Sequence, residues 1–256
     1  MLKRISIAFG DDEALWPPNE LFVADQLTRD SFSKFSSVVW YQEKSNSCSF
    51  LNELIPHFAI GDGLRLLKEV EDTLPELWKN DLFVPSEMLE WLEKNRFEIN
   101  QDEAQSIREL RIWPTADGVL NPLIDLFLAG DFEDPLRLAK LVDLDVLGGG
   151  RDFLERVLNV SQLDFITYVE SWVPSLIQNN DLKLTDKFGL IRILAENLGK
   201  LRDRDDIQSI LSGLPIVWCG DEDFFAATMV WFDSKEVRAV LGSGIKIAQL
   251  PIEKQD

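Results

Sequence analysis

The 256-residue sequence contains one histidine and two cysteines, and these scarcities exclude several kinds of site. His57 alone cannot form a zinc site, which needs a second histidine or clustered cysteines. Cys48 and Cys219 lie far apart and lack a CxxC spacing, which excludes a multi-disulfide scaffold and favours a reducing compartment. Neither cysteine has the context of an activated thiolate, so both are interpreted as inert.

Long apolar runs are also missing. No stretch approaches the roughly 20 apolar residues that a membrane-spanning helix needs. The first 13 residues, MLKRISIAFGDDE, include two basic residues but lack the apolar core of a signal peptide. The sequence therefore predicts a soluble cytoplasmic protein.

Positive charge is scarce relative to negative charge. The chain has 26 lysines and arginines against 45 aspartates and glutamates, a formal net charge of −19. Such a surface repels phosphate backbones and anionic lipid headgroups, so nucleic acid and membrane surfaces are excluded as partners. Basic proteins or divalent cations fit this charge. The acidic runs 69–72 and 203–206 are interpreted as solvated helix faces and ends.

What the sequence does contain is an internal repeat. Residues 2–23, 107–128 and 211–232 align without gaps, at shifts of 105 and then 104 positions. An aspartate is shared in the polar centre of all three copies, as Asp12, Asp117 and Asp221. The aligned apolar sets are Leu2/Ile107/Leu211, Ile5/Leu110/Leu214, Ile7/Ile112/Ile216, Leu15/Leu120/Phe224, Leu21/Leu126/Val230 and Phe22/Phe127/Trp231.

Each copy predicts a β-hairpin. Apolar residues alternate before the shared aspartate, as a half-buried strand requires. Asp12, Asp117 and Asp221 lie in a turn with a nearby glycine, and we interpret them as structural turn residues. The return strand is expected at residues 21–23, 126–128 and 230–232.

Helices are predicted between the hairpins. Asn100 with Glu103 forms a capping box, and Ser161 with Asp164 resembles another. The apolar positions of 64–77 match those of 188–201 at a shift of 124, which predicts equivalent helices. A short helix is expected over 235–241.

These elements predict an α+β fold of tandem modules, each a β-hairpin packed on a small helical bundle. The expected modules are residues 1–105, 106–210 and 211–256. Because the third lacks a bundle, the chain is expected to be a fragment of a larger repeat protein.

Two strings resemble the repeat region of sacsin-like proteins: L-x-I-W-P-T-x-D-G at Leu110–Gly118 and W-F-D-S-K-E-V-R-A-V-L-G at Trp231–Gly242. Those proteins are very large chains in which an Hsp90-like ATP-binding domain precedes long stretches of repeats. The resemblance is best over residues 107–250. It implies a non-catalytic segment of a chaperone-like protein that contacts neighbouring repeats and protein partners or clients.

The resemblance does not extend to the nucleotide site. That family's ATP-binding domain has an Asp-x-Gly-x-Gly loop, and Gly61-Asp62-Gly63 and Asp117-Gly118 lack its second glycine. The run Gly148–Gly150 has no P-loop lysine after it. We therefore assign no catalytic residue and no cofactor to this segment, and place any ATPase domain elsewhere in a parent chain.

Two other functions stay open. The acidic turns, with Asp221, Glu222 and Asp223 as the metal candidates, could serve a metal-dependent hydrolase through oxygen ligands. The middle copy has one carboxylate, Asp117, so only the turn role is common to all three. The tryptophans Trp113, Trp218 and Trp231 could make the hairpins a peptide-binding module, although aromatic residues at such positions usually belong to the core.

Overall fold

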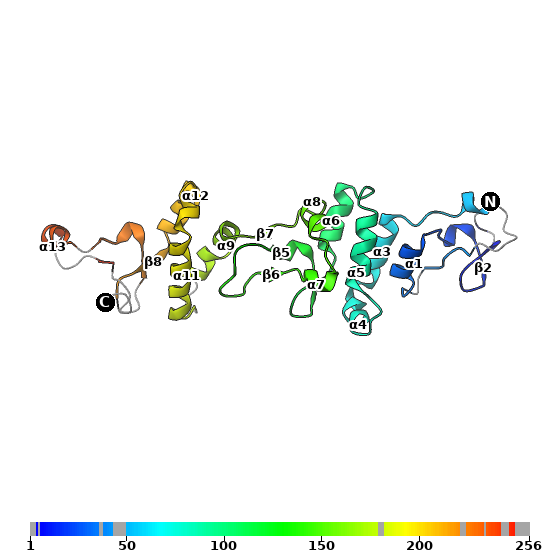
Figure 1. Cartoon of the computed structure of the whole chain (residues 1–256), viewed down its shortest axis with the longest axis horizontal. Coiled ribbons are helices and arrows are strands. Elements are labelled where there is room, and N and C mark those ends of the chain that lie inside the picture. The colour runs from blue at the N-terminus through cyan, green and yellow to red at the C-terminus, as the bar shows by residue number, and fades with distance from the viewer. Residues whose placement is uncertain are drawn as a thin grey trace. The chain divides into compact units, whose positions relative to one another are not determined.

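The computed structural model describes residue 4 and residues 6–35, 38–42, 50–178, 182–220, 224–232, 234–241 and 246–248. As the sequence predicts, the fold is α+β, with short antiparallel hairpins separated along the chain by helices (Figure 1). The chain divides into two compact units. Unit 1 comprises Met1–Ala129 and Lys140–Gln162, and unit 2 comprises Gly130–Ala139 and Leu163–Asp256.

Unit 1 contains two hairpins and most of the helices. Its strands are β1 (Ala8–Phe9), β2 (Leu15–Trp16), β3 (Trp113–Pro114), β4 (Leu120–Asn121), β5 (Leu126–Ala129) and β6 (Lys140–Leu141). Its α-helices are α1 (Gln26–Phe32), α2 (Phe50–Leu54), α3 (Ile60–Val70), α4 (Leu74–Lys79), α5 (Pro85–Lys94), α6 (Gln101–Glu109), α7 (Leu144–Leu147) and α8 (Arg151–Arg156). Its 3-10 turns are η2 (Pro18–Glu20), η3 (Glu71–Thr73) and η4 (Leu123–Asp125).

A single core joins the helices of the first predicted module to the hairpin of the second. Leu67 of α3, Trp91 of α5 and Ile107 of α6 are buried in it together with Trp113 and Leu128. In Figure 1 the helices α3 to α6 lie between the first hairpin and the β5–β6 pair. Because the second hairpin packs on helices that precede it, unit 1 does not end at residue 105. The three-module division stays a prediction.

Unit 2 contains the third hairpin and five helices among its described residues. Its α-helices are α9 (Phe165–Ser171), α10 (Val173–Gln178), α11 (Leu184–Glu196), α12 (Asp205–Ser212) and α13 (Lys235–Leu241), the last with the predicted bounds. Its strands are β8 (Pro215–Trp218) and β9 (Phe224–Ala226), and its 3-10 turns are η5 (Leu198–Leu201) and η6 (Ala227–Met229). The unit boundary falls within β7 (Gln162–Leu163).

The hairpins are tighter than predicted. Phe9 lies opposite Leu15 in the first, Pro114 opposite Leu120 in the second and Trp218 opposite Phe224 in the third. The return strands are therefore β2, β4 and β9, so the prediction that they lie at 21–23, 126–128 and 230–232 was wrong. In each copy a 3-10 turn (η2, η4 or η6) follows the return strand and redirects the chain before those apolar residues.

The mispredicted segments instead pair in parallel with a later part of the chain, at the same aligned position in all three copies. The bridged pairs are Phe22 with Trp40, Phe127 with Leu141 and Trp231 with Ile247. In each copy the next amide donates to the carbonyl of the aligned aromatic residue, from Tyr41, Val142 and Ala248. A parallel pair needs a long connection, which an apolar run in the sequence does not reveal.

The helix starts were predicted with mixed success. The capping box of α6 is confirmed, because Asn100 Oδ1 accepts from the Glu103 amide and Glu103 Oε2 accepts from the Asn100 amide. The box proposed for Ser161 and Asp164 was wrong. Asp164 is itself the N-cap of α9, and the Ser161 carbonyl accepts from the amide of Leu128.

Both segments matched at a shift of 124 are helical, in α3 and α4 and in α11 and η5, but they follow the parallel bridge at different places. Helix α3 follows the residues that pair with Val23, through the Val23 amide and the Pro56 carbonyl. The corresponding bond runs from Leu128 to Ser161, and the helix that follows it is α9 rather than α11. The apolar spacing of one amphipathic helix matches that of many others, so it does not identify a counterpart.

Among the described helices, none combines the length and the apolarity needed to cross a bilayer.

Candidate functional site

The first hairpin turn is built around Asp12. The Gly10 amide donates to the Ala14 carbonyl at 2.9 Å, which closes the turn. Asp12 Oδ1 accepts from the Ala14 amide at 3.0 Å, as an aspartate in a turn commonly does. Both carboxylate oxygens also lie within 3.1 Å of the Trp16 indole nitrogen. The hydrogen bonds of Asp12 are therefore those of a turn residue.

The second turn places Asp117 at the end of a polar chain. The Thr115 hydroxyl is hydrogen-bonded to the Asp117 carboxylate, and this bond lowers the pKa of Asp117 below its ordinary value. Asn121 Nδ2 donates to Thr115 Oγ1 at 3.1 Å, and Lys140 Nζ donates to Asn121 Oδ1 at 3.0 Å. Thr115 and Asn121 are buried, and this series of hydrogen bonds connects the hairpin to Lys140 of β6. The sequence reasoning missed it.

The first two hairpins have different side chains at the two aligned positions that face each other across the turn. Gly10 is the counterpart of Thr115, and Trp16 is the counterpart of Asn121. A methyl group added at Gly10 would meet Val39 at 2.5 Å and the Trp16 ring at 3.0 Å. The first copy therefore combines a small residue with a large one, whereas the second uses two polar residues that bond to each other.

The third turn holds the metal candidates Asp221, Glu222 and Asp223, and all three lie outside the described residues. Within the part of the chain that the structure describes, no three His, Cys, Asp or Glu side chains gather in a way that could hold a metal ion. Cys48 also lies outside it. His57 is exposed and bridges Val23, and Cys219 is half-buried.

The three hairpin tryptophans have different environments. Trp113 is buried, and its indole nitrogen donates to the Ile107 carbonyl at 3.1 Å, so it belongs to the core. Trp218 is half-buried and packs edge-on against Phe188. Trp231 is 51% exposed and is followed by Phe232, which is 87% exposed.

The exposure of the third copy is unusual among the repeats. Phe232 aligns with Leu128, which is completely buried in the second copy. Met229, beside them in η6, is 63% exposed. Met229, Trp231 and Phe232 lie within four positions of the sequence, and we call these three exposed side chains the third-copy apolar residues.

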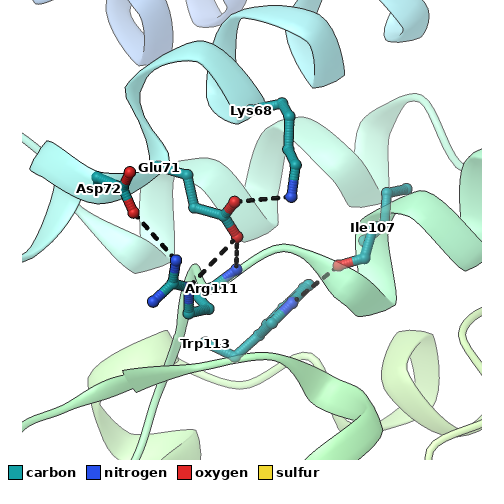
Figure 2. A network of polar contacts seen from close by, with 6 residues as sticks. All are labelled: Lys68, Glu71, Asp72, Ile107, Arg111 and Trp113. Carbon is teal, nitrogen blue, oxygen red and sulfur yellow. Dashed lines mark hydrogen bonds and ion pairs between the residues drawn. The ribbon is translucent and has the colours of Figure 1, made fainter.

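A junction of polar contacts joins α3 and η3 to the residue that precedes the second hairpin (Figure 2). Glu71 is 8% exposed although it lies in an acidic run. Its Oε1 accepts from the Arg111 amide at 2.8 Å, and its Oε2 accepts from Lys68 Nζ at 2.8 Å. The Arg111 guanidinium donates to Asp72 at 3.0 Å. The interpretation of 69–72 as a solvated face was therefore wrong for Glu71.

The electrostatics of this junction favour a charged Glu71. Burial by itself raises the pKa of the Glu71 carboxyl, but the hydrogen bonds from Lys68 and from the Arg111 amide outweigh burial and lower that pKa. A carboxylate that binds a backbone amide fixes the position of the chain. Lys68, three residues before Glu71, is the feature of the sequence that could have indicated this ion pair.

Comparisons with protein-family models, with curated proteins and with solved structures found no match to this chain.

Proposed function

We propose that this chain is a non-catalytic structural segment that contacts protein partners or clients, and that it belongs to the sacsin-like repeat region it resembles. One observation carries the proposal. The same assembly of hairpin, 3-10 turn and parallel bridge occurs in three copies, yet the third copy leaves Trp231 and Phe232 exposed. Repeats of this kind bury a continuous core only when neighbouring units cover one another.

The third-copy apolar residues support a partner of apolar character. Trp231 and Phe232 are consecutive in the sequence and both are exposed, whereas their counterparts in the second copy, Phe127 and Leu128, are half-buried and buried. Contiguous exposed apolar side chains mark protein contact surfaces. The net charge of −19 favours partners with a basic surface around the apolar contact.

The experiment measures whether the chain holds an unfolding client. A heat-sensitive test enzyme such as citrate synthase is warmed with and without the 256-residue chain, and aggregation is followed by light scattering. We expect an equimolar amount of the chain to lower the scattering. We expect the double variant Trp231→Ser, Phe232→Ser to lose that effect, because the contact area is removed.

A matched control is available in unit 1. Phe97 is a phenylalanine with the same exposure as Phe232, 87%, but it lies beyond the end of α5. Phe97→Ser is expected to protect the client as well as the parent does. Equal protection by the double variant, or none by the parent, would contradict the proposal.

A further inference from the structure

The first two copies each make a second backbone pairing, one residue after the bridged aromatic residue. In the first copy the Val23 amide donates to the Pro56 carbonyl at 2.9 Å, and the Val23 carbonyl accepts from the Phe58 amide at 2.9 Å. In the second copy the Leu128 amide donates to the Ser161 carbonyl at 3.0 Å. In both copies the carbonyl that accepts belongs to a residue 33 positions later in the chain.

Phe232 is the third-copy counterpart of these two amide donors. Its amide donates to no backbone carbonyl among the residues that the structure describes, although Trp231 beside it is bridged to Ile247 as its counterparts are bridged. The spacing of 33 positions, counted from Phe232, reaches position 265, and the chain has 256 residues. At the spacing of the repeat, these residues therefore hold no pairing segment for the third copy.

Each pairing segment also buries an aliphatic side chain. In the first copy Ile55, one residue before the accepting carbonyl, packs in a small core with Leu21. In the second copy Val160 has the same place and is buried in the core that contains Leu126. The third-copy counterpart of Leu21 and Leu126 is Val230, which is half-buried. An added segment would therefore find an apolar contact at Val230 as well as a free backbone donor.

The two pairing segments share a pattern of residues. They read Ile-Pro-His-Phe at 55–58 and Val-Ser-Gln-Leu at 160–163. Each begins with a buried aliphatic residue, and its polar third residue, His57 or Gln162, is exposed. A helix, α3 or α9, begins two residues after each segment. This pattern, aliphatic–any–polar–apolar, defines what the same edge of the third copy would accept.

We propose that the backbone of Phe232 pairs in parallel with an extended segment of a protein partner, and that this segment has the pattern aliphatic–any–polar–apolar. The second residue of the segment accepts from the Phe232 amide, its fourth residue donates to the Phe232 carbonyl, and its first residue packs on Val230. In such strand addition the backbone hydrogen bonds supply affinity and the alternate side chains supply selectivity. The proposal deepens the function proposed above and rests on it, since both place the partner at the third-copy apolar residues.

The test follows the Phe232 amide by NMR in the whole 256-residue chain. Trp231-Phe232 is the only Trp-Phe pair in the sequence, so labelling with ¹³C-carbonyl tryptophan and ¹⁵N-phenylalanine isolates this one amide. The probe is the acetylated and amidated peptide of residues 159–165, Asn-Val-Ser-Gln-Leu-Asp-Phe. We expect the peptide to shift the Phe232 signal saturably at millimolar concentration and to slow hydrogen exchange of that amide.

Two N-methylated peptides form a matched pair. A methyl group on the amide of the peptide's leucine removes the bond to the Phe232 carbonyl, so it should weaken binding at least about fivefold. A methyl group on the amide of the preceding glutamine should leave binding unchanged, because neighbouring amides of a strand point to opposite sides. The change Val160→Ser in the peptide should also weaken binding at least about fivefold, because burial of the valine side chain is lost.

Three results would overturn the proposal. The first is no saturable shift, or equal binding of the two N-methylated peptides. The second is a Phe232 amide that is protected in the chain alone and loses protection when residues 249–256 are deleted, which would assign the edge to this chain's own residues. The third is protection that is lost on dilution, which would assign the edge to a second copy.

The peptide titration and the client assay separate this inference from the proposed function. If the peptide does not bind while the parent chain still protects the client enzyme, this inference fails and the proposed function stands. If the peptide binds with the expected selectivity while the parent chain does not protect the client, the proposed function fails and the pairing at Phe232 stands.

Discussion

Removal of the Glu71 carboxylate tests how the first helices are joined to the second hairpin. The carboxylate binds the Arg111 amide and Lys68, and its side chain is almost completely buried. Lys68 is two-thirds exposed, so its ion pair contributes at most about 1 kcal/mol. A hydrogen bond from the amide to a charged acceptor contributes about 1.5–3 kcal/mol. We therefore expect Glu71→Ala to destabilise unit 1 by about 2–3 kcal/mol.

The variant Glu71→Gln distinguishes the contribution of the negative charge from that of the oxygen that accepts the hydrogen bond. Glutamine retains an oxygen for the Arg111 amide, so we expect a smaller loss, about 1 kcal/mol. The control is Asp72→Asn, because Asp72 is 90% exposed and its ion pair is with the Arg111 guanidinium. It should change stability by less than about 0.5 kcal/mol.

Hydrogen exchange of the Arg111 amide measures this bond directly. A loss of 2–3 kcal/mol corresponds to a fall in protection of about 30- to 150-fold, since 1.4 kcal/mol is a factor of ten. The reasoning is refuted if Glu71→Ala leaves the protection of the Arg111 amide unchanged, or if Asp72→Asn lowers it as much.

The same carboxyl makes the junction sensitive to acid. The pKa of Glu71 is lower in the folded chain than the ordinary value of 4.5. Its stabilisation is therefore fully present above about pH 4.5 and is lost as the pH falls through the lower folded pKa. In Glu71→Gln this part of the acid dependence of Arg111 protection should be absent.

The remaining predictions concern glycines, the turn and nucleotide. Gly63→Ala would place a methyl group 2.5 Å from the Trp91 ring in the core, so it should lower the free energy of unfolding by up to about 2 kcal/mol even after the gain in helix propensity. Gly61→Ala has open space around it and should raise that free energy by up to about 1 kcal/mol. Urea denaturation measures both. Asp117→Asn should keep the parent melting temperature and Asp117→Val should lower it, because asparagine keeps the turn bonds; equal melting of both variants would contradict the turn role. Titration calorimetry with Mg-ATP should give no binding heat, and saturable binding would overturn the assignment of a non-catalytic segment.

The sequence predicted the places of the hairpins because the shared aspartate and its neighbours specify a turn locally. It misassigned residues 21–23 and their counterparts because a parallel bridge such as Phe22 with Trp40 depends on a distant segment. It also missed Glu71, since an acid within a charged run reads as solvated until its partner, the Arg111 amide, is known.

The parallel bridges have a consequence for synthesis on the ribosome. Each hairpin is local and can close as soon as it emerges, but Phe22 must wait for Trp40, and Val23 must wait for His57. At roughly 5–20 residues per second, the last of these partners follows by about two to seven seconds. During that interval Leu21 and its apolar neighbours lack their final cover. During these seconds the apolar residues of the nascent segment are exposed, and another apolar surface could bind them before their own partners have been translated.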